Sequence, residues 1–171
     1  MVRELEGERR MRDESQISWT PENLRAILRE DLKGDEILIV SNREPYVHSQ
    51  DEGGRVIVKA TTGGVAVALD ALMRERGGVW IAHGAGPADR LVVDAADKVQ
   101  VPPESPTYAL RRLWLEEPTF SAYYGGFANE GLWPLCHVVD VRPKFRSEDW
   151  AAYQDVNARF AAAVHAELGA T

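Results

Sequence analysis

The sequence has a single cysteine, and it lacks a long apolar run and any recognisable set of metal ligands. Cys136 is the one cysteine among 171 residues, which excludes an internal disulfide. The four histidines do not have the spacing of zinc ligands, so we predict no metal site. No apolar run approaches the roughly 20 residues that cross a bilayer, and residues 1–15 contain no apolar signal core. We therefore expect no membrane partner and a cytoplasmic location.

Basic residues are also too few to form a broad positive surface. The chain has 20 Lys and Arg against 27 Asp and Glu, and a formal net charge of −7. Such a balance argues against nucleic acid as a partner. A single arginine fork still binds one phosphate at short range, so small phosphorylated ligands remain possible. The 44% hydrophobic content is enough for one buried core.

The order of local patterns along the chain predicts an α/β fold with a Rossmann-like parallel sheet. Residues 1–35 form a charged extension that ends in a short helix beginning at Thr20-Pro21. The apolar run 37–40 is typical of a strand buried on both faces of a parallel sheet. The remaining expected elements are a hairpin over 46–60, a helix after Gly63-Gly64, strands at 79–82, 98–101 and 108–115, and a helix capped by Ser147.

Three polar or glycine-rich segments follow these elements and should meet at one crevice. In open α/β sheets, ligands bind beyond the carboxyl ends of the strands, where 41–43 and His83-Gly84 are expected. Gly63-Gly64 would open a helix whose free amides suit a phosphate. From the residues alone, a plain glycine turn explains this pair more often. Arg43 suits a phosphate clamp and a surface ion pair equally well.

A segment rich in aromatic residues and glycine spans residues 123–134. Tyr123, Tyr124, Phe127 and Trp133 occur there with a density that is unusual for a plain strand or helix. Such rings often pack against sugars, although filling of the core explains most buried aromatic residues. His83 and His137 are possible acid–base groups, but a lone histidine is usually structural and no nucleophile motif is present.

Five ordered segments together resemble glycosyltransferase family 20. They are Ile39–Arg43, Thr62–Val65, Val79–Ile81, the long signature Tyr123–His137 and Trp150–Ala161. The likeness runs from about residue 36 to 168. It implies a GT-B enzyme, in which two Rossmann-like domains face a cleft. Residues 36–171 would then be an incomplete N-terminal domain, on the side that binds the acceptor.

The resemblance also implies roles for particular residues. Arg43, Tyr124 and Trp133 would surround the phosphate of the acceptor, and Gly64, with Gly63 beside it, would offer amides to the donor diphosphate. His83 stands where relatives usually have a tryptophan near the acceptor, which makes it a candidate specificity residue. Glu44 would place an acid next to the phosphate site. The catalytic groups would lie beyond Thr171.

The implied reaction is transfer of glucose, with retention, from UDP- or GDP-glucose to a phosphorylated sugar such as glucose 6-phosphate, as in trehalose biosynthesis, with no cofactor. Two alternatives from another class are a non-catalytic sugar-phosphate-binding module and a half-enzyme that needs a partner chain. A nicotinamide-dependent oxidoreductase is disfavoured because the Gly-x-Gly-x-x-Gly fingerprint is missing. The sequence leaves the oligomeric state open.

Overall fold

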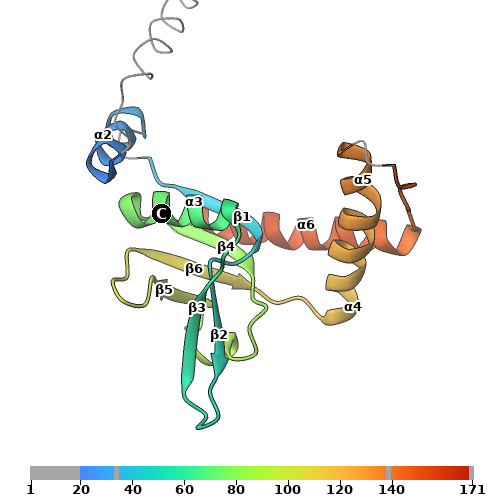
Figure 1. Cartoon of the computed structure of the whole chain (residues 1–171), viewed down its shortest axis with the longest axis horizontal. Coiled ribbons are helices and arrows are strands. Elements are labelled where there is room, and N and C mark those ends of the chain that lie inside the picture. The colour runs from blue at the N-terminus through green and yellow to red at the C-terminus, as the bar shows by residue number, and fades with distance from the viewer. Residues whose placement is uncertain (1–19, 33–34, 138–139, 170–171) are drawn as a thin grey trace, which may run out of the picture.

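A computed structural model describes residues 20–32, 35–137 and 140–169 (Figure 1). Within them a four-stranded sheet has the order β1-β4-β6-β5, and β2 and β3 form a separate antiparallel hairpin. This arrangement confirms the α/β fold. In chain order the elements are α2 (Pro21–Leu32), β1 (Leu38–Arg43), β2 (Tyr46–Gln50), β3 (Val56–Ala60), α3 (Gly64–Arg76), β4 (Val79–His83), η1 (Asp89–Leu91), β5 (Lys98–Val101), β6 (Tyr108–Leu113), α4 (Glu117–Phe120), η2 (Ser121–Leu132), α5 (Trp133–Cys136) and α6 (Ser147–Leu168).

Helices α3 and α6 cover opposite faces of the sheet. Successive side chains of a strand point to opposite faces, and β4 shows this alternation clearly. Trp80 packs in one buried cluster with Met73 of α3, whereas Ile81 packs in another with Val156 and Phe160 of α6. The result is a three-layer domain in which β4 is buried in the middle (Figure 1).

The sheet differs from the expected one at both edges. Strand β1 pairs in parallel with β4 and has no other partner among the described strands, so it lies at an edge. The prediction that residues 37–40 are buried on both faces is wrong, because Val40 is 46% exposed. At the other edge, β5 is antiparallel to β6. The short connection 102–107 permits this pairing, since parallel neighbours need a longer crossover.

Some of the helices begin or end at the residues that were predicted from the sequence. The backbone N–H of Asn23 donates to Thr20 Oγ1 at 3.3 Å, which confirms the expected cap of α2. Helix α3 ends where Gly77 adopts a φ of 80°, a conformation that favours glycine. For α6 the prediction is wrong, because Arg146 is the cap residue and Ser147 already belongs to the first turn.

The segment rich in aromatic residues and glycine forms one continuous helical column, α4–η2–α5, and its middle part has π pitch (Figure 1). Glycines allow this column to pack closely against its neighbours. A Cβ on Gly126 would lie 2.4 Å from the carboxylate of Asp149, and one on Gly131 would lie 2.7 Å from the ring of Phe145. Turns of π pitch are frequent at functional sites.

The described residues lack two features, a membrane-spanning helix and a cluster of metal ligands. No helix there combines the length and apolar character that spanning a bilayer requires. No group of three or more His, Cys, Asp or Glu side chains in that part of the chain is arranged to hold a metal ion.

Candidate functional site

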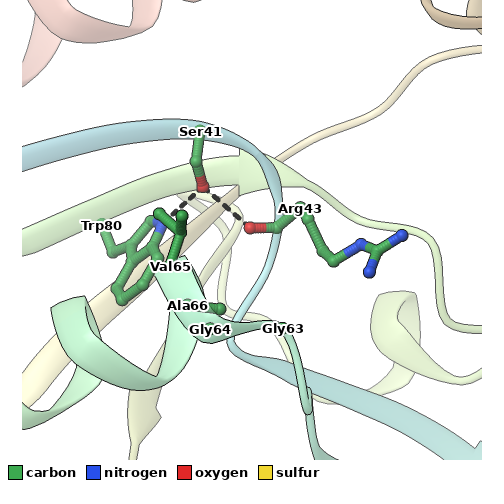
Figure 2. Close-up of a pocket in the computed structure, with 7 residues that line it drawn as sticks. All are labelled: Ser41, Arg43, Gly63, Gly64, Val65, Ala66 and Trp80. Atoms are coloured by element: carbon green, nitrogen blue, oxygen red, sulfur yellow. Dashed lines mark hydrogen bonds between the residues drawn. The ribbon is translucent and has the colours of Figure 1, made fainter.

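A pocket of about 210 Å³ lies where β1 ends and α3 begins (Figure 2). The fully buried indole of Trp80 forms part of its wall and donates from Nε1 to Ser41 Oγ at 2.8 Å. The Ser41 hydroxyl in turn donates to the backbone carbonyl of Arg43 at 2.7 Å. The first bond holds the end of β1 against β4, and the second lies within β1. The lining residues are Ser41, Arg43, Gly63, Gly64, Val65, Ala66 and Trp80.

The first turn of α3 contributes Gly64, Val65 and Ala66 to the lining of this pocket. Gly63 is the cap residue and Gly64 the first residue of the helix, and no side chain caps the turn. The first N–H groups of a helix have no partner inside the helix, and the helix dipole adds partial positive charge there. The first turn of α3 also contains no acidic residue. This helix start therefore suits an anion.

Neither glycine of this turn is needed for the backbone or for packing. Gly63 has an ordinary φ of −71°. A Cβ on Gly64 would meet nothing within 4 Å, and a Cβ on Gly63 would meet only Arg43 Nη1, at 3.9 Å. By contrast, Gly78 has a φ of 117°, and its Cβ would lie 2.2 Å from the carbonyl oxygen of Ile37. The interpretation of Gly63-Gly64 as an ordinary turn is thus weakened, and close approach of a ligand is favoured.

Arg43 extends a permanent cation beside the glycine turn. Its side chain is exposed, and Figure 2 shows the guanidinium pointing away from the indole of Trp80. Across the described part of the chain, no carboxylate forms an ion pair with this guanidinium. Within the described residues, the surface ion pair that the sequence left open as an alternative is therefore not formed.

The structure brings His83 next to Arg43 and links it to Tyr124. Arg43 and His83 are register partners in the parallel β1–β4 pair. The imidazole of His83, which is 8% exposed, stacks on Phe120 with ring centroids 4.7 Å apart. Phe120 stacks in turn on Tyr124 at 5.4 Å. Phe120 was not among the residues predicted from the sequence, although its spacing of four residues from Tyr124 indicates a shared face if the segment is helical.

Trp133 lies apart from this series of rings. Its side chain is 51% exposed and stacks on His137, with ring centroids 4.5 Å apart. Among the described residues, no contact joins Trp133 to Tyr124 or to the pocket at Arg43. His137 thus stacks on Trp133, whereas His83 stacks on Phe120.

Glu44 does not face the candidate phosphate site. Its side chain is 1% exposed and accepts from the backbone N–H of Ala85 at 2.9 Å and from Arg112 Nε at 2.8 Å. The expectation of an acid beside the phosphate is therefore corrected, because β6 supplies a buried cation that turns this carboxyl inward. Burial and the neighbouring Asp89 carboxyl raise the pKa of Glu44 to about 8, although Arg112 acts in the opposite direction.

Comparisons with known proteins identify relatives of this chain. Residues 35–170 match the family described as Glycosyltransferase family 20. Trehalose-6-phosphate synthase of Mycolicibacterium vanbaalenii is 36% identical over 130 residues, which cover 76% of this chain and 26% of the relative. The chain thus spans about a quarter of the length of that relative.

Two solved structures are similar in both fold and sequence. The alpha,alpha-trehalose-phosphate synthase (UDP-forming) of Burkholderia vietnamiensis has a TM-score of 0.53 and 26% identity, over 77% of this chain and 24% of that one. The enzyme of the same name from Burkholderia xenovorans, solved in complex with glucose-6-phosphate, has a TM-score of 0.53 and 25% identity, over 75% and 25% of the two chains.

Proposed function

Because this chain belongs to glycosyltransferase family 20, we propose that it is the acceptor-side part of a retaining glycosyltransferase of the trehalose-6-phosphate synthase type. The parent enzyme moves glucose from a nucleotide-glucose donor to a phosphorylated sugar, with glucose 6-phosphate as the default acceptor. Two solved relatives are described as UDP-forming, which favours UDP-glucose over GDP-glucose as the donor. The single cysteine agrees with a cytoplasmic location.

The observation that carries this proposal is the guanidinium of Arg43, which no carboxylate of the described residues pairs with, beside a helix start opened by glycine. An exposed arginine without a carboxylate partner keeps all its donors for a ligand. Residues of the first turn of α3 line the same pocket, and the first N–H groups of a helix have no partner inside the helix. Both features suit anionic oxygens, and both substrates in the proposed reaction carry phosphate.

We assign the acceptor phosphate to Arg43, Tyr124 and Trp133, and the donor diphosphate to the amides of Gly63 and Gly64. The stack from His83 through Phe120 to Tyr124 supports the acceptor side, because it connects the neighbour of Arg43 to the phenol. His83 is then placed to influence which sugar is accepted. The exposed indole of Trp133 would need the ligand, or a movement of the helical column, to join this group.

In this reaction the described residues bind and align the substrates. Placing two anionic substrates together and stabilising the leaving diphosphate contribute much of such a rate enhancement. The catalytic groups stay unassigned in this chain, and we expect them in a second domain. A non-catalytic sugar-phosphate-binding module is the second candidate, because the described residues of this site bind an anion without supplying a catalytic group. A reading frame that continues past Thr171 into a second Rossmann-like domain would favour the enzyme.

Calorimetric titration of this chain with glucose 6-phosphate tests the proposal, after circular dichroism has shown that each variant is folded. Arg43→Ala removes charge-assisted bonds worth about 1.5–3 kcal/mol, so the affinity should fall roughly 10- to 100-fold. Arg55→Ala is the matched control, because Arg55 is exposed in the hairpin loop and its loss changes the net charge equally. Equal weakening by both variants, or no effect of Arg43→Ala, would contradict the role of Arg43.

A further inference from the structure

Four ionisable side chains from four parts of the chain form a buried cluster behind the candidate site. Glu44 follows β1, His48 lies in β2, Asp89 in η1 and Arg112 in β6. Their exposed fractions are 1%, 5%, 0% and 2%. Buried ion pairs add little stability compared with apolar residues of similar size, because desolvation offsets their attraction. Stability alone is thus a weak reason for keeping four such groups here.

Arg112 is the centre of this cluster. Its Nε donates to Glu44 Oε2 at 2.8 Å, and its Nη2 lies 2.9 Å from Asp89 Oδ1 and 2.8 Å from His48 Nδ1. The same Nη2 donates to the carbonyl of Tyr46 at 3.1 Å. His48 and Asp89 also contact each other directly, with His48 Nδ1 3.0 Å from Asp89 Oδ1. Arg112 thereby connects β6 to both carboxyls and to β2.

The cluster holds the loop that follows His83. The backbone N–H of Ala85 donates to Glu44 Oε1 at 2.9 Å, and that of Gly86 donates to Asp89 Oδ2 at 2.6 Å. A Cβ on Gly84 would lie 3.0 Å from Cδ of Arg112, so this loop also packs against the stem of the arginine. Each residue of 84–86 therefore contacts one member of the cluster.

Glu44 also connects the two other loops of the candidate site. It directly follows Arg43 in the chain, so the fixed position of its side chain also restricts the backbone position of Arg43. Its backbone carbonyl accepts from Thr61 Oγ1 at 2.7 Å, and the carbonyl of Pro45 accepts from the Thr61 N–H at 2.8 Å. Thr61 begins the connection to Gly63-Gly64. One buried residue thus contacts all three loops that carry candidate site residues.

We propose that Glu44 is a positioning residue, which acts with Arg112 and Asp89 to hold Arg43, the Gly63-Gly64 turn and the loop after His83 in fixed relative places. The proposal rests on the function proposed above for what the site binds, although the positioning itself is independent of the ligand. Its physical basis is preorganisation, because a site for two anions loses much of its effect when its donors are displaced by about 1 Å.

Hydrogen exchange of backbone amides, followed by NMR in the chain without ligand, tests the positioning. Glu44→Leu removes the acceptor of the Ala85 amide, and we expect the amides of Ala85 and Gly86 to exchange at least about tenfold faster, while those of β4 keep their protection. Glu44→Gln keeps a side-chain oxygen and should largely preserve the protection of Ala85. Glu52→Leu removes an exposed acid from the hairpin loop and serves as the control.

If Glu44→Leu fails to fold because Arg112 Nε loses its acceptor, Glu44→Leu with Arg112→Met removes the donor together with the acceptor, and its amide exchange is interpreted in the same way. Unchanged exchange at Ala85 and Gly86 would overturn the proposal. So would exchange that accelerates equally throughout the sheet, because that result describes general destabilisation.

A second readout separates this proposal from the proposed function. In calorimetry with glucose 6-phosphate, Glu44→Leu should lower the affinity roughly tenfold, and Glu44→Gln should restore most of it. If the wild-type chain does not bind glucose 6-phosphate, the proposed function fails, and the exchange result alone decides the positioning. If the wild type binds, and Glu44→Leu loosens the loops without weakening binding, the positioning role is overturned.

Discussion

The buried carboxyl of Glu44 should make the stability of this chain fall as the pH rises through neutrality. Burial raises its pKa from the ordinary 4.5 to about 8. Between about pH 4.5 and pH 8, the folded chain therefore keeps a proton on Glu44 that the unfolded chain has already released. Stability falls with pH wherever the folded state binds more protons. The contribution of this proton to the free energy of unfolding is therefore complete below about pH 4.5 and is lost progressively as the pH approaches 8.

The range from pH 6.5 to 8 separates the titration of Glu44 from those of His48 and Asp89. Burial and Arg112 lower the pKa of His48, which makes stability fall toward acid pH, but that opposing contribution lies below about pH 6.5. Asp89 has a lowered pKa and titrates only in acid. One proton corresponds to about 1.4 kcal/mol per pH unit. The expected loss across the window is thus roughly 2 kcal/mol, or a melting temperature lower by about 4–8 °C for a chain of this size.

Urea unfolding at half-unit steps of pH measures this slope. Glu44→Gln has no proton to lose between pH 6.5 and 8. Its free energy of unfolding should therefore fall less with pH than that of the wild type, and the difference between the two slopes is the contribution of Glu44. The histidines other than His48 are present in both proteins and cancel in the difference. Glu52→Gln, which changes an exposed acid, should keep the wild-type slope. A wild-type stability that is flat over the window, or an unchanged slope in Glu44→Gln, would refute the reasoning.

Two further predictions concern stability and are measured by urea unfolding. Gly78→Ala should cost about 3 kcal/mol or more, because the φ of 117° is strained for alanine and its Cβ would lie 2.2 Å from the Ile37 carbonyl oxygen; a loss below 1 kcal/mol would contradict this. Asp70→Ala should cost about 2–4 kcal/mol, because Asp70 accepts from Tyr46 at 3.1 Å and from the buried Tyr108 at 2.5 Å; a loss under about 0.5 kcal/mol would show that these hydroxyls find other partners.

Local patterns in the sequence were enough to predict the central elements. The β-branched and aromatic run at 79–82 became the buried strand β4, and the turn residues between 51 and 54 became the loop of the β2–β3 hairpin. Gly77 ended α3 as expected, because only a residue tolerant of positive φ suits that position. These features depend on neighbours in sequence, so the sequence alone determined them.

Features that depend on distant partners were missed or mistaken. The apolar run of β1 looked like a strand covered on both faces, yet its burial depends on what lies beside it, and β4 is its one described neighbour. The close packing of Gly126 and Gly131 in η2 against Asp149 and Phe145 joins residues that lie far apart in the sequence. Phe120 became part of the candidate site only because the helical column stands beside His83.

The sequence by itself determined the family and the chemical types in the candidate site: a strand that ends in Arg43, a glycine pair that opens a helix, and an aromatic signature. Only the tertiary structure decided where Glu44 points. The sequence places this acid next to Arg43, but Arg112, which lies 68 residues further along the chain, pairs with it in the interior. A buried charge is stable only with a partner, and the fold selects that partner from distant parts of the chain.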